Sequence, residues 1–124
     1  MVGIVLSACA VLALSLLLVW WAWAVRGGHL PRNRVLGYRS RLTLADDDAW
    51  RAVNRATSPA LVTAAAGAAC GALSSVAIAI LASPATAAPA LGLAVIWSIG
   101  WVTLGVVPAH RVARRLERAS RWGR

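Results

Sequence analysis

Three long uncharged stretches of mostly apolar residues alternate with two arginine-rich segments along this chain of 124 residues. The apolar stretches cover residues 3–25, 59–81 and 89–107. At about 1.5 Å of rise per residue, each is long enough for a helix that crosses a hydrocarbon core of roughly 30 Å. The pattern therefore predicts an all-α membrane protein with three transmembrane helices, organised as a single membrane domain over residues 1–124.

The ends of these helices are predicted from local signals. The first stretch is favoured as a membrane helix over a cleaved signal peptide, because it has no basic leader and exceeds the roughly 7–15 apolar residues of a signal-peptide core. Ser58-Pro59 predicts an N-cap followed by proline at the first position of the second helix. Residues 83–89 are expected to form an uncharged turn, and Pro108 is expected to end the third helix.

Composition and charge agree with a membrane location. The chain is 60% hydrophobic, and its mean hydropathy of +0.69 is too high for an ordinary soluble domain. The net charge of +9 comes from arginine without any lysine, which in a soluble protein would suggest a nucleic-acid partner. Here the charges are confined to residues 26–58 and 108–124, so we expect contact with anionic lipid headgroups and no nucleic acid.

The charge map also predicts a topology. The second and third spans together return the chain to the side it left, so the connector of residues 26–58 and the tail of residues 108–124 share one side. The positive-inside rule assigns that side to the cytoplasm. The N-terminus is then expected outside and the C-terminus inside.

The connector is predicted to contain a short amphipathic helix at the membrane interface over residues 44–57. Thr43 to Asp46 has capping-box spacing, and Asp47 is expected to pair with Arg51 four residues later. Trp50 and Asn54 fall on one helical face. Either this helix simply lies in the interface with Trp50 inward, or Trp50, Asn54 and Arg39 form a specific cluster.

The connector also carries a recognisable motif. Its members are Asn33, Gly37, Tyr38, Arg39, Ser40, Thr43, Trp50 and Asn54. The run resembles the signature of the SdpI family, although Ser40 stands where threonine is commoner and Asn54 where many members have histidine. The resemblance covers roughly residues 3–107 and corresponds to the C-terminal half of the longer architecture of the family's namesake.

The resemblance implies a multi-pass protein of the bacterial inner membrane that gives immunity or resistance to a membrane-active peptide toxin, or signals its presence. It also implies a peptide toxin or a cytoplasmic regulator as partner. We expect Tyr38 and Arg39 to hydrogen-bond back onto the helix of Trp50, with Asn33 and Asn54 satisfying buried backbone groups. The connector would then form a rigid cytoplasmic cap on the helix bundle, able to bind a peptide, a lipid headgroup or a regulator.

A second set of candidate residues concerns helix packing. Small or hydroxylated residues recur every four positions in the second span: Thr63, Gly67, Gly71 and Ser75. Such a stripe allows close approach of the first or third helix, or of another copy in a homo-oligomer. Trp97 and Trp101 lie four residues apart near the middle of the third span, where they are expected to fill space against the second helix or to face lipid. A chain using these surfaces could alternatively be an accessory or assembly subunit of a larger membrane complex.

Catalysis is not expected. No ionisable residue lies inside any of the three spans, which disfavours a transporter or proton pathway. Asp46, Asp47 and Asp48 would point in different directions on a helix, so we predict no metal site there. No nucleophile, base and orienting group occur together, and no cofactor is predicted.

Overall fold

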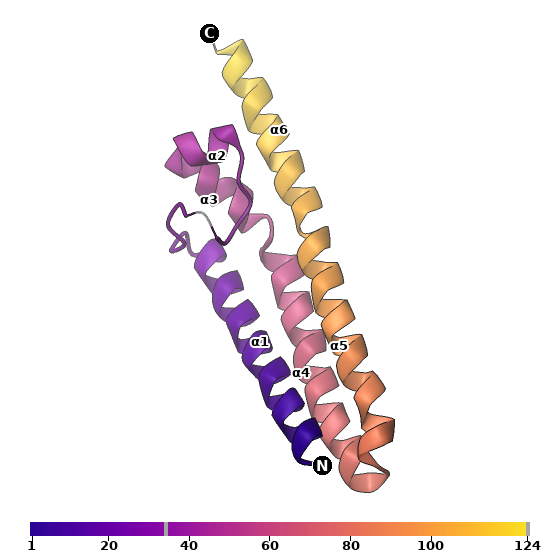
Figure 1. The fold of residues 1–124 in the computed structure, drawn as a ribbon. Coiled ribbons are helices and arrows are strands. Elements are labelled where there is room, and N and C mark those ends of the chain that lie inside the picture. Colours follow the sequence, from indigo (N-terminus) through magenta and orange to yellow (C-terminus); the bar gives the residue numbers. More distant parts are fainter. Residues whose placement is uncertain (34, 124) are drawn as a thin grey trace.

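The structure is a computed structural model that describes residues 1–33 and 35–123, leaving Arg34 and Arg124 of the two basic segments outside the described residues. Within this range the chain forms six α-helices. They are α1 (Val2–Arg26), α2 (Arg41–Ala45), α3 (Asp47–Arg55), α4 (Ser58–Leu81), α5 (Pro84–Leu104) and α6 (Val106–Trp122). Figure 1 shows α1, α4 and α5 side by side as a bundle, with α2 and α3 at one end.

Three helical stretches are long and apolar enough to cross a membrane, namely Val2–Arg26, Ser58–Leu81 and Pro84–Trp122. The all-α prediction with three spans is therefore confirmed, and the first two spans lie within one residue of their predicted ends. The N-terminus and the α4–α5 turn share one end of the bundle, whereas α2, α3 and α6 lie at the other (Figure 1).

The third span begins earlier than predicted. Residues 84–89 belong to α5 rather than to a turn, and the connection from α4 is reduced to Ala82 and Ser83. The Ser83 side chain caps the helix by accepting a hydrogen bond from the Thr86 N–H at 3.3 Å. Pro84 then occupies the first turn, where its fixed φ suits a helix and its missing N–H costs nothing.

Pro108 was predicted to end the third helix, and this prediction is wrong. A proline at this position cannot donate to the carbonyl of Leu104, and its ring crowds that carbonyl. The helix is accordingly interrupted at Gly105 and resumes as α6, with Pro108 in its first turn. Figure 1 shows α6 continuing along the line of α5 beyond the bundle. The basic tail is thus a projecting helix.

Small side chains and interhelical hydrogen bonds hold α1 against α4. Ser15 donates to the carbonyl of Ala65 at 2.9 Å, and Ser58 donates to the carbonyl of Ala22 at 3.4 Å. Ser58 therefore bonds across to α1 and does not act as the N-cap of α4, contrary to prediction; Thr57 occupies the cap position. In lipid, such close packing and hydrogen bonding replace the hydrophobic drive that folds soluble bundles.

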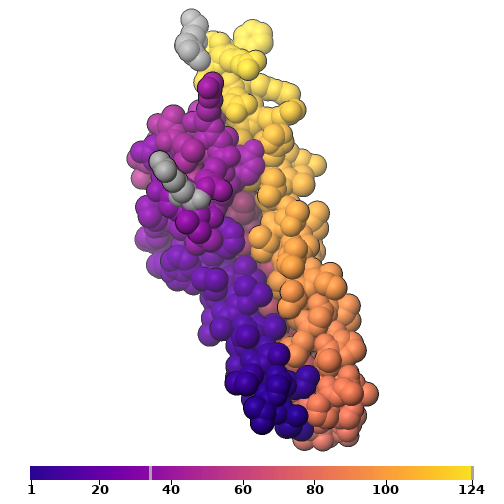
Figure 2. Space-filling model, in the orientation of Figure 1, coloured from indigo at the N-terminus to yellow at the C-terminus, as the bar shows by residue number. Residues whose placement is uncertain are grey.

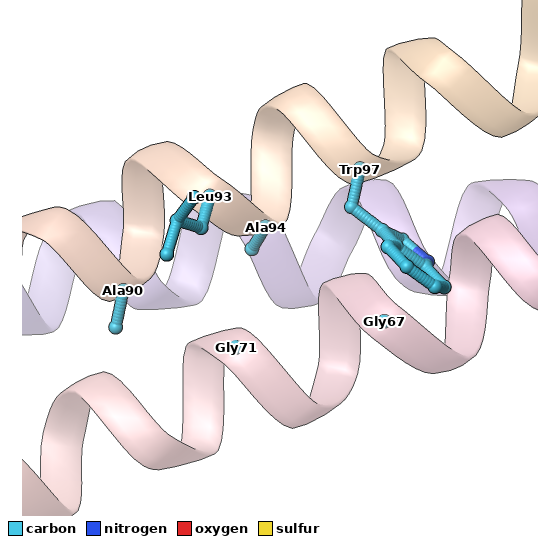
Figure 3. A pocket seen from close by; sticks show the side chains of 6 residues that line it. All are labelled: Gly67, Gly71, Ala90, Leu93, Ala94 and Trp97. Atoms are coloured by element: carbon cyan, nitrogen blue, oxygen red, sulfur yellow. The ribbon is translucent and has the colours of Figure 1, made fainter.

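The small-residue stripe of α4 receives α5. A side chain at Gly71 would overlap Ala94, and one at Gly67 would overlap the ring of Trp97, as Figure 3 shows. The Trp97 indole also donates to the carbonyl of Thr63 at 3.0 Å. Of the three occupants considered for this stripe, the third helix of the same chain is the one that lies along it.

The remaining two packing candidates lie on either side of this contact. Ser75 is fully buried and donates to the carbonyl of Ala72 in its own helix at 2.7 Å. Trp101 packs against the buried cluster around Leu18 and Leu61, and its ring centroid lies 5.7 Å from that of Trp97. Both tryptophans thus fill space beside α4, although Trp97 also remains partly exposed toward lipid.

Candidate functional site: the cap at the end of the helix bundle

Residues 27–57, which we call the cap, fold over one end of the bundle. The cap contains α2 and α3 and the loop that leads to them from α1. It lies directly against α6 on the face shown in Figure 2. All eight candidate motif residues are in this segment, so its internal contacts decide which of them act together.

The cap holds two short helices instead of the single helix predicted over residues 44–57. Ser40 caps α2, because its side chain accepts from the Thr43 N–H at 3.3 Å while the Thr43 hydroxyl accepts from the Ser40 N–H at 2.7 Å. Thr43 is therefore the inner member of a capping box, not the N-cap. Asp46 is extended and caps α3 by accepting from the Asp48 N–H at 2.9 Å. The extended backbone at Asp46 separates the two helices.

Trp50 anchors the cap to the bundle. Its side chain is only 2% exposed and belongs to the same buried cluster as Val25, Leu30 and Leu61. The indole N–H donates to the carbonyl of Leu30 at 2.8 Å. This bond satisfies both a buried donor and a loop carbonyl, which explains why the amphipathic ring can be buried here rather than at the lipid interface.

Asn54 joins α3 to the loop of residues 33–40, which we call the motif loop. Its Oδ1 accepts from the Tyr38 N–H at 2.6 Å, and its Nδ2 donates to the carbonyls of Trp50 at 3.0 Å and Tyr38 at 3.3 Å. The side chain is 1% exposed. A buried amide with this many backbone partners fixes the position of the loop, since breaking any bond would leave a desolvated polar group.

Gly37 permits this close approach. Its φ of +101° lies in the region that favours glycine. A Cβ atom at this position would lie 2.6 Å from Asn54 Oδ1 and 3.1 Å from the Trp50 ring. The motif thus combines a turn that needs glycine with the two buried side chains of α3 against which the turn packs.

Asn33 and Tyr38 organise the two ends of the motif loop. Asn33 Oδ1 accepts from the backbone N–H groups of Val35 and Leu36 at 2.9 and 2.7 Å, which closes a local turn in a mostly exposed segment. The Tyr38 hydroxyl lies 2.8 Å from His110 Nδ1 and shares a hydrogen bond with it. The tyrosine side chain was expected to bond to α3; it reaches α6 instead, and only its backbone bonds to α3.

Arg39 is exposed beside these residues. The structure therefore brings Gly37, Tyr38, Trp50 and Asn54 into one contiguous group. Asn33 and the Ser40–Thr43 capping box support the flanking turns.

The helix α6 completes the site, and sequence reasoning missed its part. Val53 of α3 is fully buried against Ala109 and Ala113 of α6, and Tyr38 packs on the same cluster. The signal was present, because Ala109 and Ala113 are small residues at helical spacing on the otherwise basic tail. Because the tail of residues 108–124 was expected to contact lipid headgroups, no packed contact between it and the connector was predicted.

The charges of the cap are partly paired. Arg32 bonds to Asp47 at 2.8 Å and Arg51 to Asp48 at 3.2 Å. The predicted pair between Asp47 and Arg51 is therefore replaced by these two, because the loop after α1 brings Arg32 to the first turn of α3. Among residues 1–33 and 35–123, no group of three or more His, Cys, Asp or Glu residues could hold a metal ion.

Comparison with known proteins matches this arrangement to one family. The model of the SdpI/YfhL protein family matches residues 29–109, which is more than half of the chain. The matched region starts in the loop after α1 and ends in α6. It contains the cap from His29 onward and all eight motif residues, whereas His110, the partner of Tyr38, lies one residue beyond it. No curated protein and no solved structure matches the chain. The chain is a membrane protein of the SdpI/YfhL family.

Proposed function

We propose that this protein protects a bacterial cell against a membrane-active peptide, or signals the presence of one, without acting as an enzyme. The recognition surface in this proposal is the cap. The observation that carries it is the group formed by Gly37, Tyr38 and Asn54, which builds a rigid loop out of motif residues. A preorganised surface at the end of a membrane bundle can bind a peptide without first ordering a flexible loop.

The contact between the cap and α6 supports the signalling form of the proposal. Tyr38 and Val53 hold α6 through His110, Ala109 and Ala113. An agent that displaced the motif loop would disturb this contact, and α6 projects away from the bundle where a cytoplasmic regulator could meet it (Figure 1). The exposed arginines of α6 would favour an acidic surface on that regulator.

The direct test is deletion of the gene followed by challenge with membrane-active peptides. We expect the deletion strain to become more sensitive and the wild-type chain to restore resistance. The variants Arg39→Ala and Trp50→Ala should fail to restore it while inserting normally into the membrane. The matched control is Trp20→Ala, which removes the same side chain as Trp50→Ala but from an exposed position on α1. Full protection by both cap variants would contradict the cap as recognition surface.

The proposed location is the bacterial inner membrane, with the cap and α6 in the cytoplasm and the N-terminus outside. This orientation follows the positive-inside rule, since both arginine-rich segments lie at one end of the bundle. Cysteine labelling in intact cells tests it after the two free cysteines, Cys9 and Cys70, are replaced by alanine. A single cysteine at Ala85 should then react with an impermeant reagent, and one at Ser120 should not.

A second candidate function is that of an accessory or assembly subunit, in a larger membrane complex or a homo-oligomer. The observation favouring it is a shallow apolar groove of about 370 Å³, open beside the α4–α5 contact and lined by Gly67, Leu93 and Trp97 among others (Figure 3). Purification in a mild detergent distinguishes the two functions. A companion chain in fixed ratio favours the subunit role, and increased peptide sensitivity of the deletion strain favours protection.

A further inference from the structure

A separate cleft lies between the end of α1 and the start of α4. It has a volume of about 420 Å³ and is lined by Arg26, Arg55, Ser58, Pro59 and Val62. Both arginines are exposed, and neither takes part in the ion pairs found among the described residues. Two cations without acidic partners thus line a single opening, which favours an anionic ligand.

The position of the cleft restricts the kind of anion. Arg26 is the last residue of α1 and Ser58 is the first of α4, so the opening lies where two apolar spans end. This is the depth of lipid headgroups in a membrane-spanning bundle. Arginine at such a position extends its guanidinium toward the headgroup region while its aliphatic part stays on apolar surface.

An exposed apolar strip continues from the cleft toward the bilayer centre. Val62 lines the cleft and is exposed. Val19 is also exposed, and it lies two helical turns before Arg26 and so on the same side of α1. A ligand that combines an anionic head with an apolar chain would match both the cationic opening and this strip. A soluble acidic peptide would match only the cationic opening and not the apolar strip.

We propose that this cleft binds an anionic phospholipid, with its phosphate between the guanidinium groups of Arg26 and Arg55 and one acyl chain along Val19 and Val62. Guanidinium groups offer paired donors that fit phosphate oxygens. Because Arg26 belongs to α1 and Arg55 to α3, the bound lipid would tie the cap to the bundle. This inference is independent of the protective role proposed above, since it concerns only lipid binding and cap stability.

The test uses the purified full chain in phosphatidylcholine nanodiscs with and without a minor fraction of phosphatidylglycerol. Lipid retention is read by native mass spectrometry, and cap stability by hydrogen exchange of residues 47–55. We expect phosphatidylglycerol to be retained and to slow exchange in the wild type. The double variant Arg26→Gln/Arg55→Gln should bind it about thirtyfold more weakly, given about 1 kcal/mol for each basic residue near an anionic surface.

The control variant is Arg111→Gln/Arg115→Gln, which removes the same charge from exposed positions of α6. It should retain phosphatidylglycerol as the wild type does. Equal loss in both double variants would show diffuse attraction to the membrane and overturn the proposed site. Inorganic phosphate and glycerol phosphate form the third arm. If either slows exchange as much as the lipid does, the cleft is a general anion site and the lipid assignment is wrong.

Discussion

Replacing Gly37 by alanine is the sharpest perturbation of the cap. The new Cβ would lie 2.6 Å from Asn54 Oδ1, the atom that accepts the hydrogen bond from the Tyr38 N–H. It would also force an L side chain to adopt a φ of +101°. Both effects act on the loop between α1 and α2, whereas the three spans keep their own contacts. We therefore expect local loss of the cap rather than unfolding of the bundle.

The expected cost is the sum of two contributions. A residue other than glycine at an unfavourable backbone conformation costs about 1–3 kcal/mol. Displacing the buried Asn54 side chain from the Tyr38 N–H costs a further 1–3 kcal/mol, or thereabouts, because its amide oxygen is left without a partner. Alanine recovers about 0.4–1 kcal/mol by restricting the unfolded chain. The net destabilisation of the cap is then about 1–6 kcal/mol.

Hydrogen exchange in nanodiscs measures this cost locally. A loss of about 2 kcal/mol corresponds to roughly thirtyfold faster exchange of the protected amides in residues 37–55. Gly92→Ala is the matched control, because a Cβ there meets nothing within 4 Å. In an Asn54→Ala background the added effect of Gly37→Ala should shrink to its backbone contribution. Unchanged exchange in Gly37→Ala, or an undiminished effect in that background, would refute the contact with Asn54 as the cause.

Three further substitutions test other contacts. Trp50→Phe keeps an aromatic side chain but removes the indole N–H and leaves the buried carbonyl of Leu30 without its donor, so the cap should lose about 1–3 kcal/mol by the same exchange measurement. Exchange as slow as in the wild type would show that this hydrogen bond contributes little. Gly71→Ala introduces an overlap between α4 and α5 and should destabilise the bundle by about 1–3 kcal/mol, which lowers its denaturation temperature in mild detergent. An unchanged denaturation temperature would mean that the two helices move apart without cost. Tyr38→Phe removes an exposed bond to α6, so exchange in α6 should rise by a small factor, corresponding to about 1 kcal/mol or less, while exchange in α3 stays the same.

The sequence predicted the spans and the family but only part of the cap. Its capping signals were ambiguous, because Ser40, Thr43 and Asp46 can each cap a helix. The structure uses Ser40 and Asp46 and buries Thr43 between them. The ion pairs were ambiguous in the same way, since Asp47 has a partner in its own helix and another in the loop after α1. Local spacing cannot choose between such partners when the choice depends on how the loop folds back.

The amino-acid sequence by itself determined that the chain has three membrane spans. An uncharged apolar run of sufficient length must be helical in lipid, since each backbone polar group has to find its partner within the segment. Only the tertiary structure decided that α5 lies along the Gly67–Gly71 stripe, that α6 continues past Pro108 to pack on Val53, and that Asn54 holds the Gly37–Tyr38 turn. These contacts join residues far apart in the chain, and their formation depends on helix positions that no local pattern specifies.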